Sequence, residues 1–250
     1  MSAPARVRAE AVAAARTFAR RRTAVFFTFF FPLLIILIFG AMVRAAPDAG
    51  GMFGEPPAYY LPGYLATVVV FTPLSRIGAT VTRHREDRRF EKLATTPLSR
   101  GEWLLAHALV TAAIVTVASA LILVLVVALT GAVLHPSPWL LAYVLAGVGL
   151  FVGLGALMGR VAQTQDGVIA ASNTVAFPLL FLSETFIPPA LLPGWFRPLM
   201  GLSPLTYFAR GVRAVGTDLA GGGHLPNLAL LVALAVVLLV AGALALPVTE

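Results

Sequence analysis

The chain has 250 residues, of which 59% are hydrophobic and 12% are charged, and its mean hydropathy is +0.90. These values exclude a soluble globular domain, and several apolar runs reach the roughly 20 residues that cross a lipid hydrocarbon layer. The absence of cysteine excludes disulfides, thiolate metal sites and cysteine nucleophiles. The net charge of +7 is informative mainly through its position along a membrane protein.

Residues 5–22 are predicted to form a basic helix that lies against the membrane interface. Its apolar side is weak, but Arg20, Arg21 and Arg22 directly precede the first long apolar run, where they would meet anionic headgroups. A disordered basic tail is one alternative. A secretory signal peptide is another, although the twenty-residue apolar run at 24–43 is long for such a peptide.

Six apolar segments are predicted to cross the membrane, which gives the fold class as an all-α integral membrane protein with one domain over residues 1–250. The spans are residues 24–43, 61–81, 104–129, 139–158, 167–183 and 228–246. Arg76 lies in the second span, where its side chain must reach the interface, pair with another group or face a wet cavity, and its place near the charged loop favours the first. Gly149, Gly153 and Gly155 in the fourth span, with Gly159 directly after it, predict close helix packing within one subunit.

Residues 184–215 differ from the spans because five prolines divide their apolar residues into short pieces. Backbone that is not helical is tolerated at membrane depth only where protein or water covers it. We therefore predict a re-entrant extracytoplasmic helical hairpin between the fifth and sixth spans, packed on the other helices or lining a cavity.

The distribution of Lys and Arg predicts the orientation. The tail before Ala24 and the loop at 83–102 hold six each, and the turn at 160–166 adds one, against four in the segments on the other side. Loops rich in Lys and Arg remain in the cytoplasm. The prediction is a multi-pass protein of the plasma membrane with both termini cytoplasmic.

No constellation of reactive side chains points to an enzyme or to a nucleic-acid-binding protein. The four histidines fall in four separate segments without ligand spacing, so we predict no catalytic, cofactor-binding or metal site. Lys92 is the single lysine and follows Glu91, whereas a nucleotide-binding P-loop needs a lysine directly after glycine. Energy from ATP would therefore reach this chain through a partner.

The charged loop at 83–102 is predicted to contain a short amphipathic helix. Phe90 and Leu93 lie three residues apart and would share one small apolar face. Ion pairs are expected along the sides of the helix, between Arg83 and Asp87, Glu86 and Arg89, and Arg88 and Glu91. Such a helix suits docking into a cleft on another protein, and a solvated loop with a lipid-facing edge is the alternative.

Sequence signals also mark where this helix ends and the third span begins. Pro97 disfavours helical backbone at Thr96, so the helix should break there. Ser99 followed three residues later by Glu102 forms a capping box that starts the next helix. We expect Trp103 to lie at the level of the lipid headgroups.

Two stretches in this order resemble the permease subunits of ABC exporters of the type-2 class, most closely the small, daunorubicin-resistance-like type. They are RHREDRRFEKLATTPLSRGEWLLAHAL, residues 83–109, and LPGWFRPLMGLSPLTYFARGVRAV, residues 192–215. The first is similar to the loop between the second and third spans of that family, and the second to its re-entrant extracellular segment. The chain departs from the family pattern at Arg88 and Arg89, where Gly and Thr are frequent, and at Ser203, where Asn is usual.

The resemblance implies a permease homodimer with two cytosolic ABC ATPase subunits, which would bind ATP and Mg. The implied activity is export of a hydrophobic or amphipathic substrate, such as a drug, a lipid or a glycan-linked molecule. Residues expected to couple to the ATPase are Arg88, Phe90, Glu91, Leu93, Thr96, Pro97, Leu98, Ser99 and Arg100. The substrate path is expected at the dimer interface, along Asn173, Phe177, Phe181, Glu184 and Tyr207.

Two other functions agree with the same sequence features. A membrane scaffold or sensor would use the charged loop to dock a cytosolic partner without moving a substrate. A lipid-acting membrane enzyme would need Glu184 as an essential acid at the outer hairpin.

Overall fold

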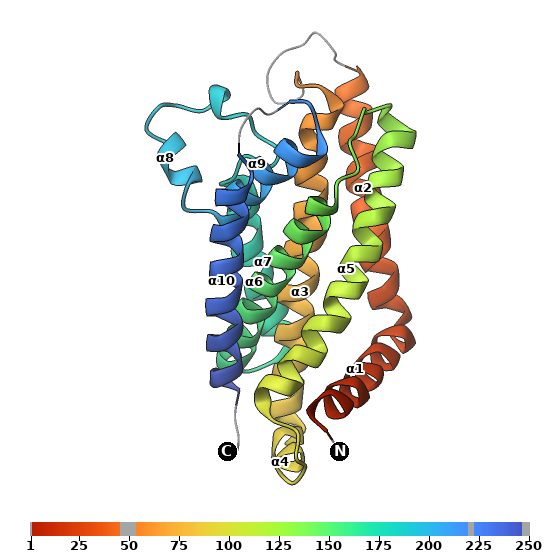
Figure 1. The fold of residues 1–250 in the computed structure, drawn as a ribbon, viewed down its shortest axis with the longest axis vertical. Helices are drawn as coiled ribbons and strands as arrows, with labels where there is room; N and C mark the ends of the chain where they lie inside the picture. Colours follow the sequence, from red (N-terminus) through yellow and green to blue (C-terminus); the bar gives the residue numbers. More distant parts are fainter. Residues whose placement is uncertain (1, 46–53, 220–222, 247–250) are drawn as a thin grey trace.

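The computed structural model describes residues 2–45, 54–219 and 223–246, and it is a bundle of long helices with short helices at both ends (Figure 1). The elements are α1 (Ala3–Arg20), α2 (Arg22–Ala45), η2 (Pro57–Tyr60), α3 (Leu61–Glu86), α4 (Arg89–Ala94), α5 (Arg100–Thr130), α6 (Pro138–Val161), α7 (Gln165–Phe181), η3 (Pro189–Leu191), α8 (Arg197–Met200), α9 (Pro204–Gly216) and α10 (Leu225–Ala245). Strands are absent from these described residues, so the all-α prediction is confirmed for them.

Five helical segments in the described ranges are long and apolar enough to cross a membrane. They are Arg22–Met42, Pro57–Glu86, Arg100–Thr130, Pro138–Val161 and Leu225–Ala245. They coincide with five of the predicted spans. The other predicted span, 167–183, corresponds to α7, a helix of 17 residues, or about 25 Å at about 1.5 Å per residue.

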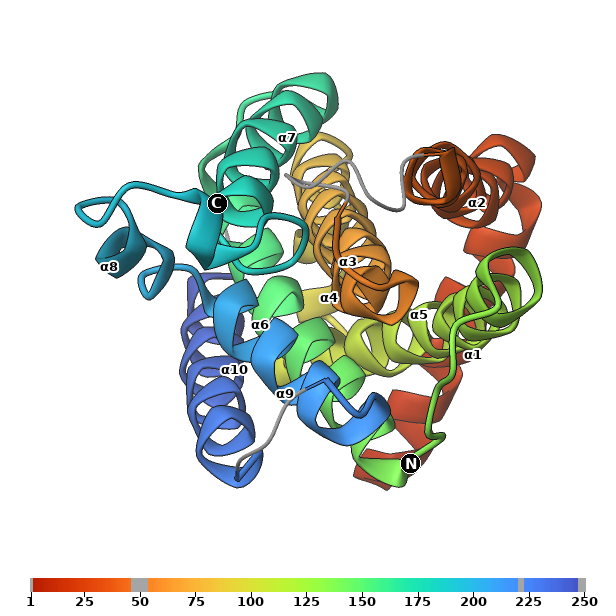
Figure 2. The same cartoon turned by 90° about the horizontal axis from the view of Figure 1, so that it is seen from above.

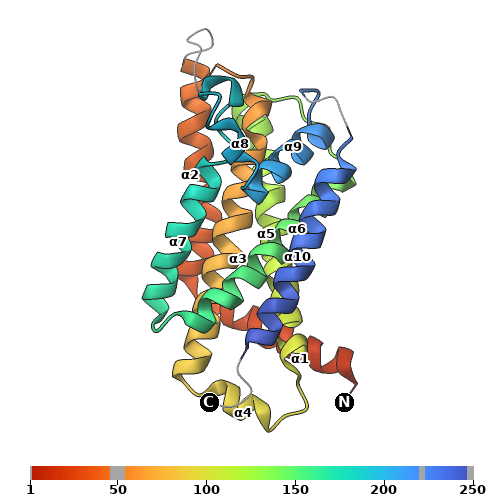
Figure 3. The same cartoon turned by 90° about the vertical axis from the view of Figure 1, so that its left-hand side faces the viewer.

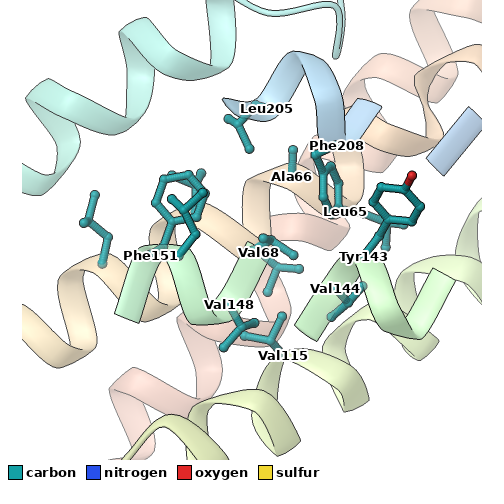
Figure 4. Close-up of a cluster of buried hydrophobic side chains, with 14 of the residues drawn as sticks. Leu65, Ala66, Val68, Val115, Tyr143, Val144, Val148, Phe151, Leu205 and Phe208 are labelled. Carbon is teal, nitrogen blue, oxygen red and sulfur yellow. The ribbon is translucent and has the colours of Figure 1, made fainter. Parts of the chain in front are cut away.

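Helices α3 and α6 form the centre of the bundle, whereas α2 and α10 lie at its edge (Figure 2). The core contains large side chains from α3, α5, α6 and α9, including the fully buried Tyr143, Phe151 and Phe208 (Figure 4). The outer faces of α2, α5 and α10 expose many large apolar residues. Apolar outer faces are what helices in contact with lipid tails require.

The glycines of α6 allow two close helix contacts, and both are made within the chain. A Cβ added at Gly153 would lie 2.3 Å from the carbonyl carbon of Leu238 in α10. A Cβ added at Gly159 would lie 2.6 Å from the carbonyl oxygen of Gly78 in α3. The prediction that these small residues pack within one subunit is confirmed.

The cationic segments gather at one end of the bundle, which we call the α4 end and which contains α1, α4 and the turn from α6 to α7 (Figure 3). Contacts between these segments support this placement, because the Nη1 atom of Arg85 lies 2.7 Å from the carbonyl oxygen of Arg160. The opposite end, which we call the α9 end, contains η2, η3, α8 and α9. The predicted clustering of Lys and Arg on one side of the bundle therefore has a structural counterpart.

Candidate coupling segment and adjoining cavity

Residues 83–102 form a compact turn between α3 and α5. Arg88 stands before α4 with φ of 50° and ψ of 34°, in the left-handed region. At the start of α5, the backbone N–H of Glu102 donates to the Ser99 hydroxyl (3.2 Å), and the Ser99 N–H donates to the Glu102 carboxylate (2.8 Å). The predicted short helix and capping box are confirmed.

The ring of Phe90 lies inside the chain, so the prediction that it forms an outward docking face is wrong. Phe90 is 8% exposed, and its ring centroid lies 5.3 Å from that of Trp103 and 5.5 Å from that of His84. Trp103 is itself 2% exposed, so its ring is covered by the protein, and its level relative to the headgroups stays a prediction. The six-residue α4 folds back under α3 and α5, and its one aromatic ring covers the aromatic cluster there.

The ion pairs of this loop also differ from the prediction. The backbone changes direction at Asp87 and Arg88, so a continuous helical spacing of side chains does not extend across them. The salt bridge recorded here joins Arg89 to Asp87 at 3.1 Å. Glu86 instead accepts a hydrogen bond from the Gln165 amide at 3.1 Å, on the turn that leads into α7.

The other predicted coupling residues form a polar rim at the tip of the α4 end. Leu93 and Leu98 are half-buried against the core. Six are exposed, namely Arg88, Glu91, Thr96, Pro97, Ser99 and Arg100. A partner that approaches this end would therefore meet hydroxyl, charged and backbone groups, supported from behind by Phe90.

Helix α1 is attached to α5 by two charged contacts that sequence reasoning missed. The Arg6 guanidinium donates to both carboxylate oxygens of Glu102, at 3.1 and 2.5 Å, so Glu102 serves both the helix cap and this ion pair. Glu10 lies 3.1 Å from Nε2 of His107, and this hydrogen bond holds the pKa of Glu10 below its usual value. The sequence of α1 predicts a basic helix, but it does not predict that Arg6 contacts Glu102 or that Glu10 contacts His107.

Arg85 connects the end of α3 to the end of α6. Its Nη1 atom donates to the carbonyl oxygens of Gly159, Arg160 and Ala162, at 3.3, 2.7 and 3.0 Å. Carbonyls at a helix C-terminus lack partners within the helix and carry partial negative charge, so a cation there is favourable. A displacement of the charged loop would thus be transmitted to the turn between α6 and α7.

A cavity of about 1,540 Å³ lies beside this segment, between α1, α2, α3 and α7. Of the predicted path residues, Asn173 and Phe177 line it, whereas Phe181, Glu184 and Tyr207 do not. Phe177 makes an edge contact with Phe71 of α3, with ring centroids 5.0 Å apart. Two of the five residues therefore line the cavity, Phe181 stacks on Phe177 just outside it, and Glu184 and Tyr207 lie at the α9 end.

Arg76 lines this cavity and does not extend to the interface, so that prediction is wrong. Its Nη1 atom donates to the hydroxyl of Thr111 at 2.6 Å, and its guanidinium lies over the ring of Phe18, 5.7 Å from the centroid. These contacts hold the side chain sideways between α3, α5 and α1. A cation at this depth is costly unless polar groups or an anion accompany it.

Glu184 is part of a charged cluster at the α9 end. The Arg210 guanidinium donates to both of its carboxylate oxygens, at 3.0 and 2.5 Å, and this contact raises the pKa of Arg210. Arg213 donates to the backbone carbonyl of Glu184 and lies 3.9 Å over the ring of Tyr59, and burial lowers the pKa of Arg213. Glu184 is thus an anchor for the segment before α9, not a free acid aimed into a cavity.

Tyr207 and Ser203 belong to the same end and have local structural roles. The Tyr207 hydroxyl donates to the carbonyl of Gly201 at 3.1 Å. Ser203 caps α9, since its hydroxyl accepts from the N–H of Leu205 at 3.3 Å. An asparagine at this position could cap the helix in the same way, so the departure at Ser203 preserves the local chemistry.

A bundle of membrane-length helices with a basic turn at one end and a large cavity beside it defines a multi-pass membrane protein. The chain belongs to the ABC-2 type transporter family, whose sequence pattern matches residues 7–216. It is 26% identical over 197 residues to the daunorubicin resistance ABC transporter permease protein DrrB1 of Streptomyces coeruleorubidus, a match that covers 76% of this chain and 67% of that protein. Membership identifies a transmembrane transporter subunit that works with a partner ABC ATPase.

Proposed function

We propose that the chain is the transmembrane subunit of an ATP-driven exporter of a hydrophobic or amphipathic substrate. Two copies would associate with two cytosolic ABC ATPase subunits, which would bind ATP and Mg. The observation that carries this proposal is the mechanical connection of the turn at 83–102. Phe90 and Trp103, the Arg6 to Glu102 pair and the Arg85 contacts join it to α1, α3, α5 and α6.

The topology we propose has six crossings, with α7 as the fifth. Gln165 is tied to Glu86 at the α4 end, and the residues after Phe181 lead into the charged cluster at the α9 end. A helix of about 25 Å is short for a membrane about 30 Å thick, but local thinning or the polar ends of the helix can accommodate the difference. The α4 end, where the cations gather, would face the cytoplasm of a plasma-membrane protein.

Residues 184–215 would form the outer, re-entrant part of this permease. Their short helices η3, α8 and α9 lie at the α9 end. The ion pair between Glu184 and the half-exposed Arg210 supports a fixed closure on that side. Trp195, which is 73% exposed, would meet the outer lipid headgroups.

The proposed mechanism is alternating access, driven by force on the polar rim at the tip of the α4 end. Closure of the ATPase subunits would push on this rim, and the rigid contacts behind it would tilt α3 and α5 together. The Arg85 contacts would carry the same displacement to α6 and α7. Because α1, α2, α3 and α7 surround the cavity, their relative tilt would change its access.

The substrate path would begin in this cavity and continue along α7. Asn173 and Phe177 line the cavity, and the rings of Phe177 and Phe181 stack with centroids 6.5 Å apart. Phe181 is 50% exposed on the outer face of α7, where a second permease copy could cover it. Glu184 and Tyr207 would then lie near the outer end of the path.

A charge-altering variant of the rim tests the coupling proposal. We expect Glu91→Arg with Thr96→Arg to insert normally but to lose co-purification with the ABC ATPase of the same cells and ATP-driven transport. Both positions are exposed, so the fold should tolerate the change. A matched control is Ala190→Arg with Gly194→Arg, which adds the same groups to exposed positions at the α9 end.

The outcome separates the exporter from the scaffold. Normal ATPase binding and transport by the rim variant would contradict the coupling role. A complex that binds the ATPase through this rim but shows no substrate-stimulated ATP hydrolysis after reconstitution would favour a scaffold or sensor. The lipid-acting enzyme has no specific support, because the carboxylate that it needs is engaged by Arg210.

A further inference from the structure

The cavity beside α3 has a polar and an apolar part. Its lining on α3 extends from Thr67 to His84, or about 25 Å along the helix. Toward the middle of the bundle the lining is largely aliphatic and aromatic, with Phe27, Val68, Phe71 and Phe177. Toward the α4 end it becomes strongly cationic.

Five cations line this end and have no salt bridge among the residues that the structure describes. We call them the basic collar, and they are Arg20, Arg21, Arg76, Arg83 and Lys92. Two other charged residues of the lining are already paired, since Arg89 bridges Asp87 and Glu10 meets His107. Glu10 is the one acid among the lining residues that the structure describes, so the five cations of the collar leave an excess of positive charge in a partly enclosed site.

The collar comes from three separate parts of the chain. Arg20 and Arg21 lie where α1 meets α2, Arg76 and Arg83 lie on α3, and Lys92 lies on α4. Arg76 and Arg21 are close enough for their like charges to repel each other. An anion between them would remove this repulsion, and guanidinium groups bind phosphate and carboxylate groups well.

We propose that the cavity binds an anionic amphiphile, with its phosphate, sulfate or carboxylate head in the basic collar and its tail along Phe71 and Phe177. This inference names a substrate class for the proposed export function and rests on that function for its physiological meaning. The volume of about 1,540 Å³ is ample for an alkyl chain with a polar head. A cationic amphiphile would meet the same collar with repulsion.

Selective binding tests the proposal on the full chain in nanodiscs of neutral phosphatidylcholine. Native mass spectrometry would compare dodecyl phosphate with dodecyltrimethylammonium, which has the same tail and the opposite charge. We expect at least a tenfold preference for dodecyl phosphate. Equal binding of the two probes, or a preference for the cation, would overturn the proposal.

Substitutions at the C-terminal end of α1 test whether the anion binds in the basic collar. Arg20→Gln with Arg21→Gln should weaken binding of dodecyl phosphate at least tenfold, and both side chains are exposed enough for the fold to persist. The matched control is Arg8→Gln with Arg16→Gln, which removes the same charge from exposed positions of α1 outside the cavity lining. Equal loss in both double variants would indicate general surface attraction and would overturn the site.

Two further probes distinguish the source of the ligand. Phosphatidylglycerol that binds with the same dependence on Arg20 and Arg21 would point to a bilayer lipid, whereas binding of dodecyl phosphate alone would point to a single-chain amphiphile. Both results support the proposal. Inorganic phosphate that binds as tightly as dodecyl phosphate would show that the tail contributes nothing, and would contradict it.

These measurements need no ATPase, so failure of the substrate class and failure of the export function are separable. ATP-driven transport without anion-selective binding would overturn the substrate class alone. Anion-selective binding by a chain that engages no ATPase would overturn the export function and leave the binding site in place.

Discussion

Among single residues, Arg88 determines how the charged loop turns between α3 and α4. It is the one non-glycine residue with positive φ in the described ranges, at φ of 50°. The left-handed region costs an L-residue with a side chain about 1–2 kcal/mol, because its Cβ crowds the next carbonyl oxygen. The glycine that is frequent at this position in the family would adopt this backbone conformation without that cost.

We predict that Arg88→Gly stabilises the chain by about 1 kcal/mol, or about 2–4 °C in the midpoint of thermal unfolding. The control is Arg89→Gly, one residue later, where the backbone is helical and glycine should destabilise by up to about 1 kcal/mol. Thermal unfolding in detergent would measure both. Equal shifts in the two variants would contradict a role for the backbone angle.

Glu184 and Arg210 form an ion pair at the α9 end. The Glu184 side chain is 11% exposed and that of Arg210 is 50% exposed, so loss of the acid leaves a cation that water can reach. We predict that Glu184→Gln destabilises by about 1–2 kcal/mol, less than a fully buried pair would cost. If Arg210→Gln is already present, the added cost should be small, and unfolding of the two single variants and the double variant measures this coupling.

Additive losses in that cycle would show that the two side chains do not depend on each other. A rescue of stability by Glu184→Gln would indicate that the acid is held under strain for another purpose.

The side chains of this end also show that a residue's contacts cannot be predicted from its type alone. Glu184 and Tyr207 are predicted along the substrate path, but their side chains contact Arg210 and the carbonyl of Gly201.

At the level of helices, the packing of α6 depends on how closely it approaches α10 and α3. A Cβ at Gly153 would meet backbone atoms of Leu238 and Leu239 at 2.3–2.6 Å, and backbone atoms cannot move without moving the helix. At Gly149 the nearest atoms are the Cβ of Ala235 and the Cδ1 of Leu239, both at 3.3 Å, so relief needs a movement of only a few tenths of an ångström. The two sites therefore differ in tolerance despite the same spacing pattern.

We predict that Gly153→Ala destabilises by about 1–3 kcal/mol, as overpacking does, and that Gly149→Ala costs clearly less. Gly101 supplies the control, because a Cβ there meets nothing within 4 Å and alanine favours a helix. Detergent-resistant folded fraction after heating would rank the three variants. A Gly153→Ala protein as stable as Gly101→Ala would show that α6 and α10 do not pack this closely.

Which helices form could be predicted because the lipid requires long apolar runs and because Ser99 and Glu102 are close in sequence. Which face a side chain presents could not be predicted in the same way. Phe90 has the spacing of a docking face, but the fold turns α4 back so that the ring meets Trp103 and His84. Likewise Arg6 pairs with Glu102, which lies 96 residues away, and a contact over this separation cannot be predicted from the local sequence.

For the whole molecule, the decisive arrangement is the separation of charge between the two ends. The α4 end contains most of the cations, together with the polar rim and the basic collar. The α9 end contains the anchored segment around Glu184 and the exposed Trp195. If the α4 end faces the cytoplasm, the rim meets ATPase subunits and the collar opens toward the inner leaflet.

The absence of cysteine makes this orientation directly measurable. Thr95→Cys adds one thiol at an exposed position beside the rim, and Gly194→Cys adds one at an exposed position of the α9 end where a Cβ meets nothing within 4 Å. Intact cells treated with a membrane-impermeant maleimide should label Gly194→Cys strongly and Thr95→Cys only after permeabilisation. The parent chain, which has no thiol, gives the background. The reverse pattern would place the rim outside the cell, away from any ATP, and would contradict both the coupling mechanism and the proposed direction of export.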